Sequence, residues 1–360
     1  MKKKKVYLTL QNGTVFQGYR FGADGEATGE LVFSTGMVGY VETLTDPCNF
    51  GQIVVQTFPL IGNYGVAPCD AESDKAWVSA YVVREICDTP SNFRSEGTLE
   101  DYLKGKGVIG IYGVDTRELT KIIREEGAMN ATISDKPLTE DNLAALNTYK
   151  VVDAIGAVAP TSKTVYGDEN AEYTVALWNF GCKKSIIDGF VEQGIRVISM
   201  PATATAEEIL ALNADGVVIS DGAGDPKDAD FAVKEIKKVL GKKLVFGVGF
   251  GHLLVALAFG ADTAKQKYGH RGGNQPVKCL ESGRVYISAQ NHGYTVVNES
   301  VKQGNVTFVN VNDGTCEGID YDEWNAFTVQ FAPASCGNGN VENPLYKKFF
   351  ALMKKEKENA

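Results

Sequence analysis

Residues 244–260 read LVFGVGFGHLLVALAFG. An apolar run leads into three closely spaced glycines, and a second apolar stretch leaves them. A short apolar run, a glycine turn and a longer apolar stretch are typical of a buried strand, a sharp turn and a helix. Gly249, which has no side chain, stands at the tip of this turn. The stretch therefore predicts one unit of an α/β sheet.

The segments around this stretch repeat the same alternation. Buried strands are expected in YTVALWNFG from 173, GIRVISMPA from 194 and DGVVISDGAGDP from 215. Helices are expected over 185–193, 205–212 and 228–240. Alternating strands and helices predict a doubly wound, mostly parallel sheet, in which sites form at the carboxyl ends of the strands. Those ends are here the glycine turns at 181, 222–224 and 247–251.

The N-terminal part has a different pattern, with short β-rich runs such as VYLTL, TVFQGYRFG and ELVFSTG. Helices are expected over 98–104 with a Thr98 cap, over 115–126, and over 138–146. We therefore predict a mixed α/β domain over 1–155, a polar, turn-rich linker over 156–172, and a second domain over 173–360 that ends in an amphipathic helix.

Composition restricts the class of protein. The chain has 360 residues and a formal net charge of -9, which indicates two domains and argues against a nucleic-acid partner. No segment approaches the ~20 uninterrupted apolar residues of a membrane span. The basic start MKKKKVYLTL has an apolar part that is shorter than the ~7–15 residues of a signal peptide core. Seven dispersed cysteines without CxxC pairs favour thiols in a reducing cytoplasm over disulfides or a metal site.

The glycine turn allows three interpretations. A dinucleotide fingerprint G-x-G-x-x-G fits Gly247 and Gly249, but its third glycine falls on His252. A nucleophile elbow fits the spacing of Gly247 and Gly251, with backbone N–H groups at the helix start available to an oxyanion. The nucleophile position is then Gly249, the least costly residue at positive φ. The third interpretation is an ordinary strand-to-helix turn, which the local sequence alone favours.

Longer strings identify a family. The N-terminal half contains FSTGMVGYVETLTDPCNFGQIV, FPLIGNYGV, VVREICDTPSNFRSEGTLEDYL and GVDTRELTKIIREEGAMN. The C-terminal half contains FGCKKSII, SDGAGDP, KYGHRGGNQPV and AQNHGYTV. Together they resemble the small (glutamine amidotransferase) subunit of carbamoyl-phosphate synthetase over essentially the whole chain. The resemblance implies an N-terminal small-subunit domain followed by a class I glutamine amidotransferase-like domain.

The resemblance also implies a partner and a reaction. In the family, the small subunit hydrolyses glutamine and passes ammonia to a large subunit, which makes carbamoyl phosphate from bicarbonate and ATP. No cofactor is expected on this chain, because ATP and Mg²⁺ belong to the large subunit in that family.

The residues that would carry glutamine hydrolysis are missing. The family uses a Cys nucleophile, a His base and a Glu that orients the His. Its elbow resembles FGICLGHQLL where this chain has FGVGFGHLL, so the nucleophile position is Gly249. Its late motif resembles VQYHPEA where this chain has VQFAPAS, so the other two positions are Ala332 and Ala334. We expect no useful glutaminase activity.

The glutamine-binding shell of the family is kept in part. Its members here are Gly36, Gly222, Gly224, the Phe250 backbone N–H, Leu253, Asn291, Gly293 and Tyr294. Leu253 stands where the family has a glutamine-contacting Gln, and we expect it to face the amino acid and weaken its binding. His252, His270 and His292 belong to family strings and are expected to be structural.

Three hypotheses remain open. The leading one is a glutaminase-inactive small subunit that binds the large subunit and leaves synthesis dependent on free ammonia. The second is an active glutaminase with a displaced nucleophile, Cys182 or Cys336. The third is a free-standing binding protein that uses the remnant pocket.

Overall fold

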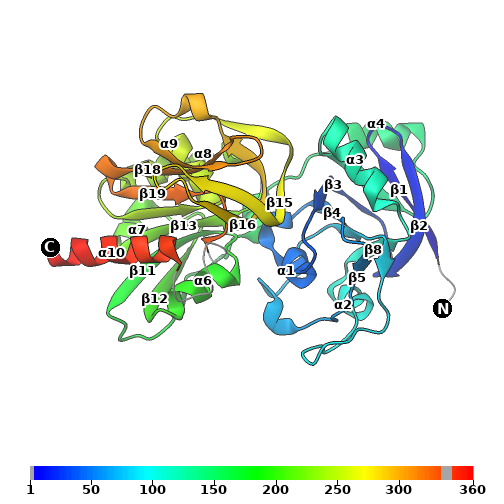
Figure 1. Ribbon diagram of the computed structural model, residues 1–360, viewed down its shortest axis with the longest axis horizontal. Coiled ribbons are helices and arrows are strands. Elements are labelled where there is room, and N and C mark those ends of the chain that lie inside the picture. Colours follow the sequence, from blue (N-terminus) through cyan, green and yellow to red (C-terminus); the bar gives the residue numbers. More distant parts are fainter. Residues whose placement is uncertain (1–3, 334–342, 360) are drawn as a thin grey trace. The chain divides into compact units, whose positions relative to one another are not determined.

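A computed structural model describes residues 4–333 and 343–359 (Figure 1). Its contacts divide the chain into two units, one of residues 1–154 with 267–272 and the other of residues 155–266 with 273–360. The fold is α/β, as predicted, and each unit has its own sheet and hydrophobic core.

The first unit is built on a closed barrel in the order β1-β2-β8-β6-β4-β3-β9. Its strands are β1 (Lys5–Leu10), β2 (Val15–Gly22), β3 (Ala27–Ser34), β4 (Gln52–Gln56), β6 (Ala80–Val82), β8 (Ile109–Tyr112) and β9 (Met129–Ser134), with β5 (Leu60–Ile61) and β7 (Glu85–Ile86) paired separately. Its helices are α1 (Tyr40–Thr45), α2 (Leu99–Lys106), α3 (Thr116–Glu126) and α4 (Glu140–Thr148).

Both faces of these strands are apolar. Leu31 and Phe33 of β3 belong to one core with Leu119 and Ile123 of α3. The intervening Val32 belongs to another core, together with residues of α1 and α2. Since side chains alternate along a strand, the helices bury both faces.

The helix starts in this unit follow from their caps. The Thr98 side chain accepts a hydrogen bond from the N–H of Asp101 at 3.1 Å, and Asp115 accepts from the N–H groups of Arg117 and Glu118. Each cap satisfies donors that have no partner within the helix. The predictions of helices beginning at these two residues are confirmed.

The second unit contains a sheet in the order β10-β12-β11-β13-β14-β19-β18-β17-β15-β16. Its strands are β10 (Thr164–Tyr166), β11 (Tyr173–Phe180), β12 (Ile195–Pro201), β13 (Gly216–Gly222), β14 (Val245–Val248), β15 (Thr263–Cys279), β16 (Val285–Val296), β17 (Asn305–Asn310), β18 (Cys316–Tyr321) and β19 (Ala326–Val329). The pairs β11–β12, β11–β13, β13–β14 and β14–β19 are parallel, while β17 and β18 pair antiparallel. The predicted parallel sheet thus forms the middle of a mixed sheet.

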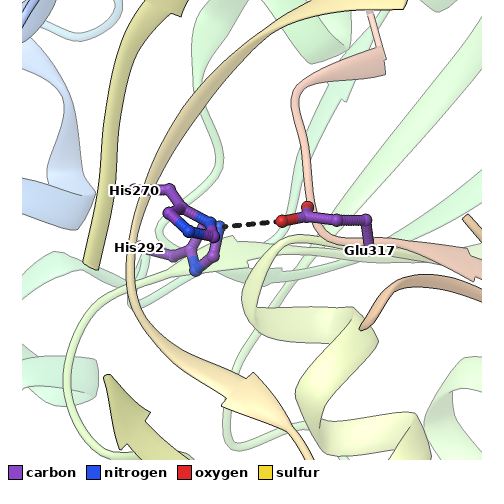
Figure 2. Close-up of side chains that lie close together, drawn as sticks. All are labelled: His270, His292 and Glu317. Atoms are coloured by element: carbon purple, nitrogen blue, oxygen red, sulfur yellow. Dashed lines mark ion pairs between the residues drawn. The ribbon is translucent and has the colours of Figure 1, made fainter. Parts of the chain in front are cut away.

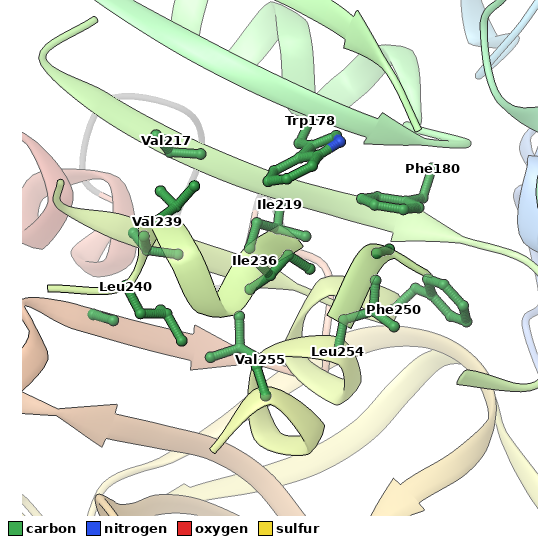
Figure 3. Packing of buried hydrophobic residues seen from close by; sticks show 14 of the residues in the cluster. Trp178, Phe180, Val217, Ile219, Ile236, Val239, Leu240, Phe250, Leu254 and Val255 are labelled. Carbon is green, nitrogen blue, oxygen red and sulfur yellow. The ribbon is translucent and has the colours of Figure 1, made fainter. Parts of the chain in front are cut away.

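Helices cover both faces of this sheet. They are α5 (Ala154–Val158), α6 (Lys184–Val191), α7 (Ala206–Ala211), α8 (Asp230–Val239), α9 (Phe250–Ala258) and α10 (Pro344–Asn359). Residues of α8 and α9 pack with Trp178, Val217 and Ile219 of the strands (Figure 3). Residues of α6 and α10 pack on the intervening strand residues. This double cover is the reason why the strands read as continuous apolar runs.

The segment predicted as a linker, 156–172, is not without structure. Within it, β10 pairs antiparallel with β12, with Val165 opposite Ile198. The short run Thr-Val-Tyr is β-branched and aromatic, which suits an edge strand. Its polar, turn-rich surroundings concealed this strand in the sequence.

Candidate functional site

The turn at Gly249 has the backbone of a nucleophile elbow. Gly249 follows β14 directly and precedes α9, with φ 55° and ψ -108°. Its N–H donates to the Val329 carbonyl at 2.8 Å, and its own carbonyl accepts from the N–H of His252 at 3.1 Å. Only glycine adopts such a positive φ without strain, whereas other residues there cost about 1–3 kcal/mol. Backbone hydrogen bonds at both its N–H and its carbonyl therefore fix Gly249, although this residue presents no side chain.

The flanking glycines allow the helix to approach the sheet closely. A Cβ atom at Gly251 would lie 2.1 Å from the Ile219 carbonyl oxygen. One at Gly247 would lie 2.8 Å from Cγ2 of Thr328. One at Gly222 would lie 2.6 Å from the Phe180 carbonyl oxygen. These glycines are thus required by packing, independently of any catalytic role.

The start of α9 is buried. The ring of His252 is fully buried, with Nδ1 2.8 Å from Oγ1 of Thr328, and burial lowers its pKa to about 3. A neutral, packed His252 agrees with the structural role expected for it. Leu253 is 2% exposed and belongs to the same apolar core as Phe180 and Leu254. In this structure the Leu253 side chain packs into the core, and its effect on glutamine binding stays a prediction.

Ala332, which stands where the family has its His, follows the strand next to β14. Residues 329–332 continue from β19, which pairs in parallel with β14 so that Val329 lies opposite Val248. The N–H of Ala332 donates to the Ala289 carbonyl of β16 at 3.0 Å. The structure thus places Gly249 and the 329–332 segment at the ends of neighbouring strands. Ala334 and Cys336 lie outside the described residues.

Two charged residues that sequence reasoning did not single out lie at the elbow. Lys183 Nζ and Asp221 Oδ2 are 2.8 Å apart, and these residues are only 8% and 6% exposed. Asp221 Oδ1 accepts from the N–H groups of Gly222 at 3.1 Å and Phe250 at 3.3 Å. Both residues occur in strings quoted above, FGCKKSII and SDGAGDP, but nothing in those strings indicates that they pair. The Phe250 N–H, expected to serve an oxyanion, already donates to a carboxylate.

The remaining family positions on β16 border a buried polar network. Asn291, Gly293 and Tyr294 are half-buried on this strand. Between them, His292 Nε2 lies 3.1 Å from Oε1 of Gln290 and 3.9 Å from Oε1 of the fully buried Glu317 (Figure 2). Gln290 Nε2 also donates to Oε2 of Glu317 at 3.1 Å, so the network links β16 to β18.

Further positions lie apart from the elbow in the chain. Gly36 belongs to the first unit, where its N–H donates to Oγ of Ser34 at 3.4 Å. His270, also drawn in Figure 2, is buried in the stretch of β15 that groups with that unit. Gly224 has φ 98° and forms the turn after β13.

Cys182 follows β11, and its thiol lies 3.4 Å from the Lys183 carbonyl oxygen. Its side chain packs against the core formed with α6 and α10, whereas α9 packs in the core on the other face of the sheet. This placement gives no support to Cys182 as a displaced nucleophile.

Among the described residues, neither Gly249 nor Ala332 offers a group that can attack an amide or accept a proton.

No helix within the described ranges is long and apolar enough to cross a membrane.

Two family profiles match the chain. The profile for the carbamoyl-phosphate synthase small chain, CPSase domain, matches residues 8–133. The profile for glutamine amidotransferase class-I matches residues 176–352. Their order along the chain is the order of the two units described above.

Curated relatives match over nearly the whole length. A carbamoyl phosphate synthase small chain from Bacillus caldolyticus is 44% identical over 356 residues, covering 97% of each chain. One from Clostridium perfringens is 45% identical over 348 residues, covering 96% of this chain and 98% of the relative.

Among solved structures, a putative GMP synthase subunit from Thermoplasma acidophilum is 17% identical with a TM-score of 0.44, over 52% of this chain and 96% of that chain. A glutamine amidotransferase from Thermotoga maritima is 16% identical with a TM-score of 0.36, over 52% of this chain and 84% of that chain.

Proposed function

Because this chain belongs to the carbamoyl-phosphate synthase small-chain family, we propose that it is a small subunit that has lost its own glutaminase chemistry. In this proposal it forms a heterodimer with a large synthetase subunit in the cytoplasm and supports its conformation. The large subunit then makes carbamoyl phosphate for pyrimidine and arginine biosynthesis from free ammonia, with ATP and Mg²⁺ bound on the large subunit.

The observation that carries the proposal is the elbow at Gly249. Its backbone has the positive φ of a turn that presents a nucleophile, yet no side chain stands there. Ala332 gives independent support, because a methyl group replaces a proton acceptor at the end of the neighbouring strand. Without a nucleophile, no covalent glutamyl intermediate forms. Removing a comparable triad lowers turnover roughly a million-fold.

The experiment is to purify the full chain with a co-expressed large subunit and to measure carbamoyl phosphate formation. Ammonium is expected to support synthesis, which also serves as the control that the large subunit is active. Glutamine at the same concentration is expected to support none above the rate without a nitrogen donor. Synthesis from glutamine at a rate close to that from ammonium would contradict the proposal.

Co-purification distinguishes a subunit from a free-standing binding protein. A stable complex of the two chains on size exclusion is expected. Elution of the two chains as separate species would instead favour the free-standing protein.

A further inference from the structure

We propose that Asp221 occludes the elbow, so that restoring a cysteine at position 249 does not by itself restore a usable nucleophile. The inference deepens the function proposed above and rests on it, since it gives a physical reason for the lasting loss of glutaminase chemistry. It concerns the space and the charge around the tip of the turn.

The space is already filled. A Cβ atom built on Gly249 would lie 2.2 Å from Oδ1, 2.7 Å from Cγ and 3.2 Å from Oδ2 of Asp221. Carbon atoms that are not bonded attract each other at about 3.5–4.0 Å, so the two shorter of these contacts lie well inside the repulsive range. Any side chain at position 249 must therefore displace this carboxylate.

The carboxylate is held where it is. Its Oδ1 atom accepts from the N–H groups of Gly222 and Phe250, and its Oδ2 atom pairs with Nζ of Lys183 at 2.8 Å. Moving it would break a buried ion pair and two hydrogen bonds to a charged group, which are among the stronger contacts in a protein interior. Displacement is therefore costly although the side chain is short.

The charge of Asp221 opposes the chemistry as well. A nucleophilic cysteine acts as its thiolate, and a carboxylate beside it disfavours that anion. The Phe250 N–H, which would stabilise an oxyanion in an elbow of this kind, is directed at the same carboxylate. Occlusion thus acts on the nucleophile and on the oxyanion donor together.

A double-mutant cycle on the full chain tests the steric part. Gly249→Ala is made alone and together with Asp221→Ala, and the urea midpoint of each variant is measured. We expect Gly249→Ala to lower the midpoint more when Asp221 is present than when it is replaced. An equal decrease in both backgrounds would overturn the proposal.

The matched control is Gly260→Ala. Gly260 also has a positive φ, +83°, but a Cβ atom there meets nothing within 4 Å. Gly260→Ala therefore introduces backbone strain without a steric clash. We expect it to lower the urea midpoint by the same amount with and without Asp221→Ala. If Asp221→Ala is too unstable to study, Lys183→Met with Asp221→Asn removes the ion pair that holds the side chain but keeps its volume. A smaller reduction in the cost of Gly249→Ala is then expected, and no reduction would overturn the proposal.

Thiol modification tests whether Asp221 lowers the reactivity of a cysteine at position 249. Because it does not use glutamine, its result can be distinguished from that of the synthesis assay. In Gly249→Cys, the introduced thiol is alkylated by iodoacetamide and located by peptide mass mapping among the native cysteines. Adding Asp221→Ala is expected to raise its rate about tenfold or more, because ~1 unit of thiol pKa changes the thiolate fraction tenfold. An equally fast reaction in both variants would contradict occlusion.

Discussion

The Nδ1 atom of His252 lies 2.8 Å from the Oγ1 atom of Thr328, and this contact joins the first turn of α9 to β19. The ring is fully buried, and its Nε2 atom has no hydrogen-bond partner among the described residues. Burial therefore keeps the imidazole neutral, with a pKa of about 3 instead of 6.5.

This histidine makes the stability of the protein depend on pH. Below pH 6.5 the unfolded chain binds a proton at His252, whereas the native state does not until about pH 3, so stability rises with pH in this window. Between pH 7 and pH 5 the contribution amounts to about 2 kcal/mol of unfolding free energy. Urea unfolding at both values is expected to show a smaller loss for His252→Gln than for the parent chain. Equal losses would show that His252 has the same pKa in the native and unfolded states, which contradicts its burial as a neutral ring.

The ion pair at the elbow predicts strong coupling between its members. Lys183→Met leaves the buried Asp221 carboxylate without this cation, which we expect to cost about 3–5 kcal/mol of unfolding free energy. Lys183→Met combined with Asp221→Asn removes both charges and is expected to cost less than Lys183→Met alone. The exposed pair of Lys184 and Asp188 provides the control, since Lys184→Met is expected to cost less than about 1 kcal/mol. Equal costs at the two lysines would contradict a buried pair.

The closeness of α9 to the sheet predicts that Gly251 cannot be replaced. A methyl group there would lie 2.1 Å from a backbone oxygen of β13, so that the helix itself must shift. Gly251→Ala is expected to lower the unfolding free energy by about 1–3 kcal/mol or more. Gly105→Ala in α2, where a Cβ atom meets nothing within 4 Å, is expected to be neutral or stabilising. Thermal unfolding of the two variants measures the difference, and similar melting temperatures would argue against this packing.

The C-terminal helix is expected to hold the sheet beneath the site. Phe349 is fully buried, and its ring lies 5.6 Å from that of Phe246 and 6.2 Å from that of Phe327. Phe349→Ala is expected to cost about 3–5 kcal/mol. The neighbouring Phe350 is only partly buried, so Phe350→Ala is the matched control with a smaller expected cost. Chemical denaturation distinguishes them, and equal costs would mean that α10 is not anchored through Phe349.

Local signals in the sequence predicted the elements well. The helix expected over 205–212 is α7, and its start is fixed by a capping box between Thr205 and Glu208. The strand, turn and helix around Gly249 follow from apolar runs and glycines whose effects are local. The closed barrel was not predicted, because it depends on pairings between strands far apart, such as β1 with β9.

The sequence predicted which catalytic side chains are missing from the site, but not which charged residues lie there instead. Gly249 and Ala332 are read directly from motif positions. The pairing of Lys183 with Asp221 is not, since adjacent lysines in FGCKKSII are more often solvated, and only the fold brings one of them against β13. The packing of Leu253 was not predictable either, because its motif position indicates a ligand contact while only the fold shows that its apolar side chain packs inward.

The carboxylate against Gly249 also bears on the order of mutations by which a descendant of this chain regains an active elbow. A return of cysteine before Asp221 changes would introduce an atom 2.2 Å from Oδ1, and we expect this intermediate to be less stable and inert. A change at Asp221 first removes the partner of Lys183 at Oδ2 with no gain in activity. Under the proposed function, either first step is expected to cost stability with no gain in activity, because Ala332 still lacks a proton acceptor. The elbow would then act as an evolutionary ratchet, in which Asp221 adds one more change to those that a return of glutamine hydrolysis requires.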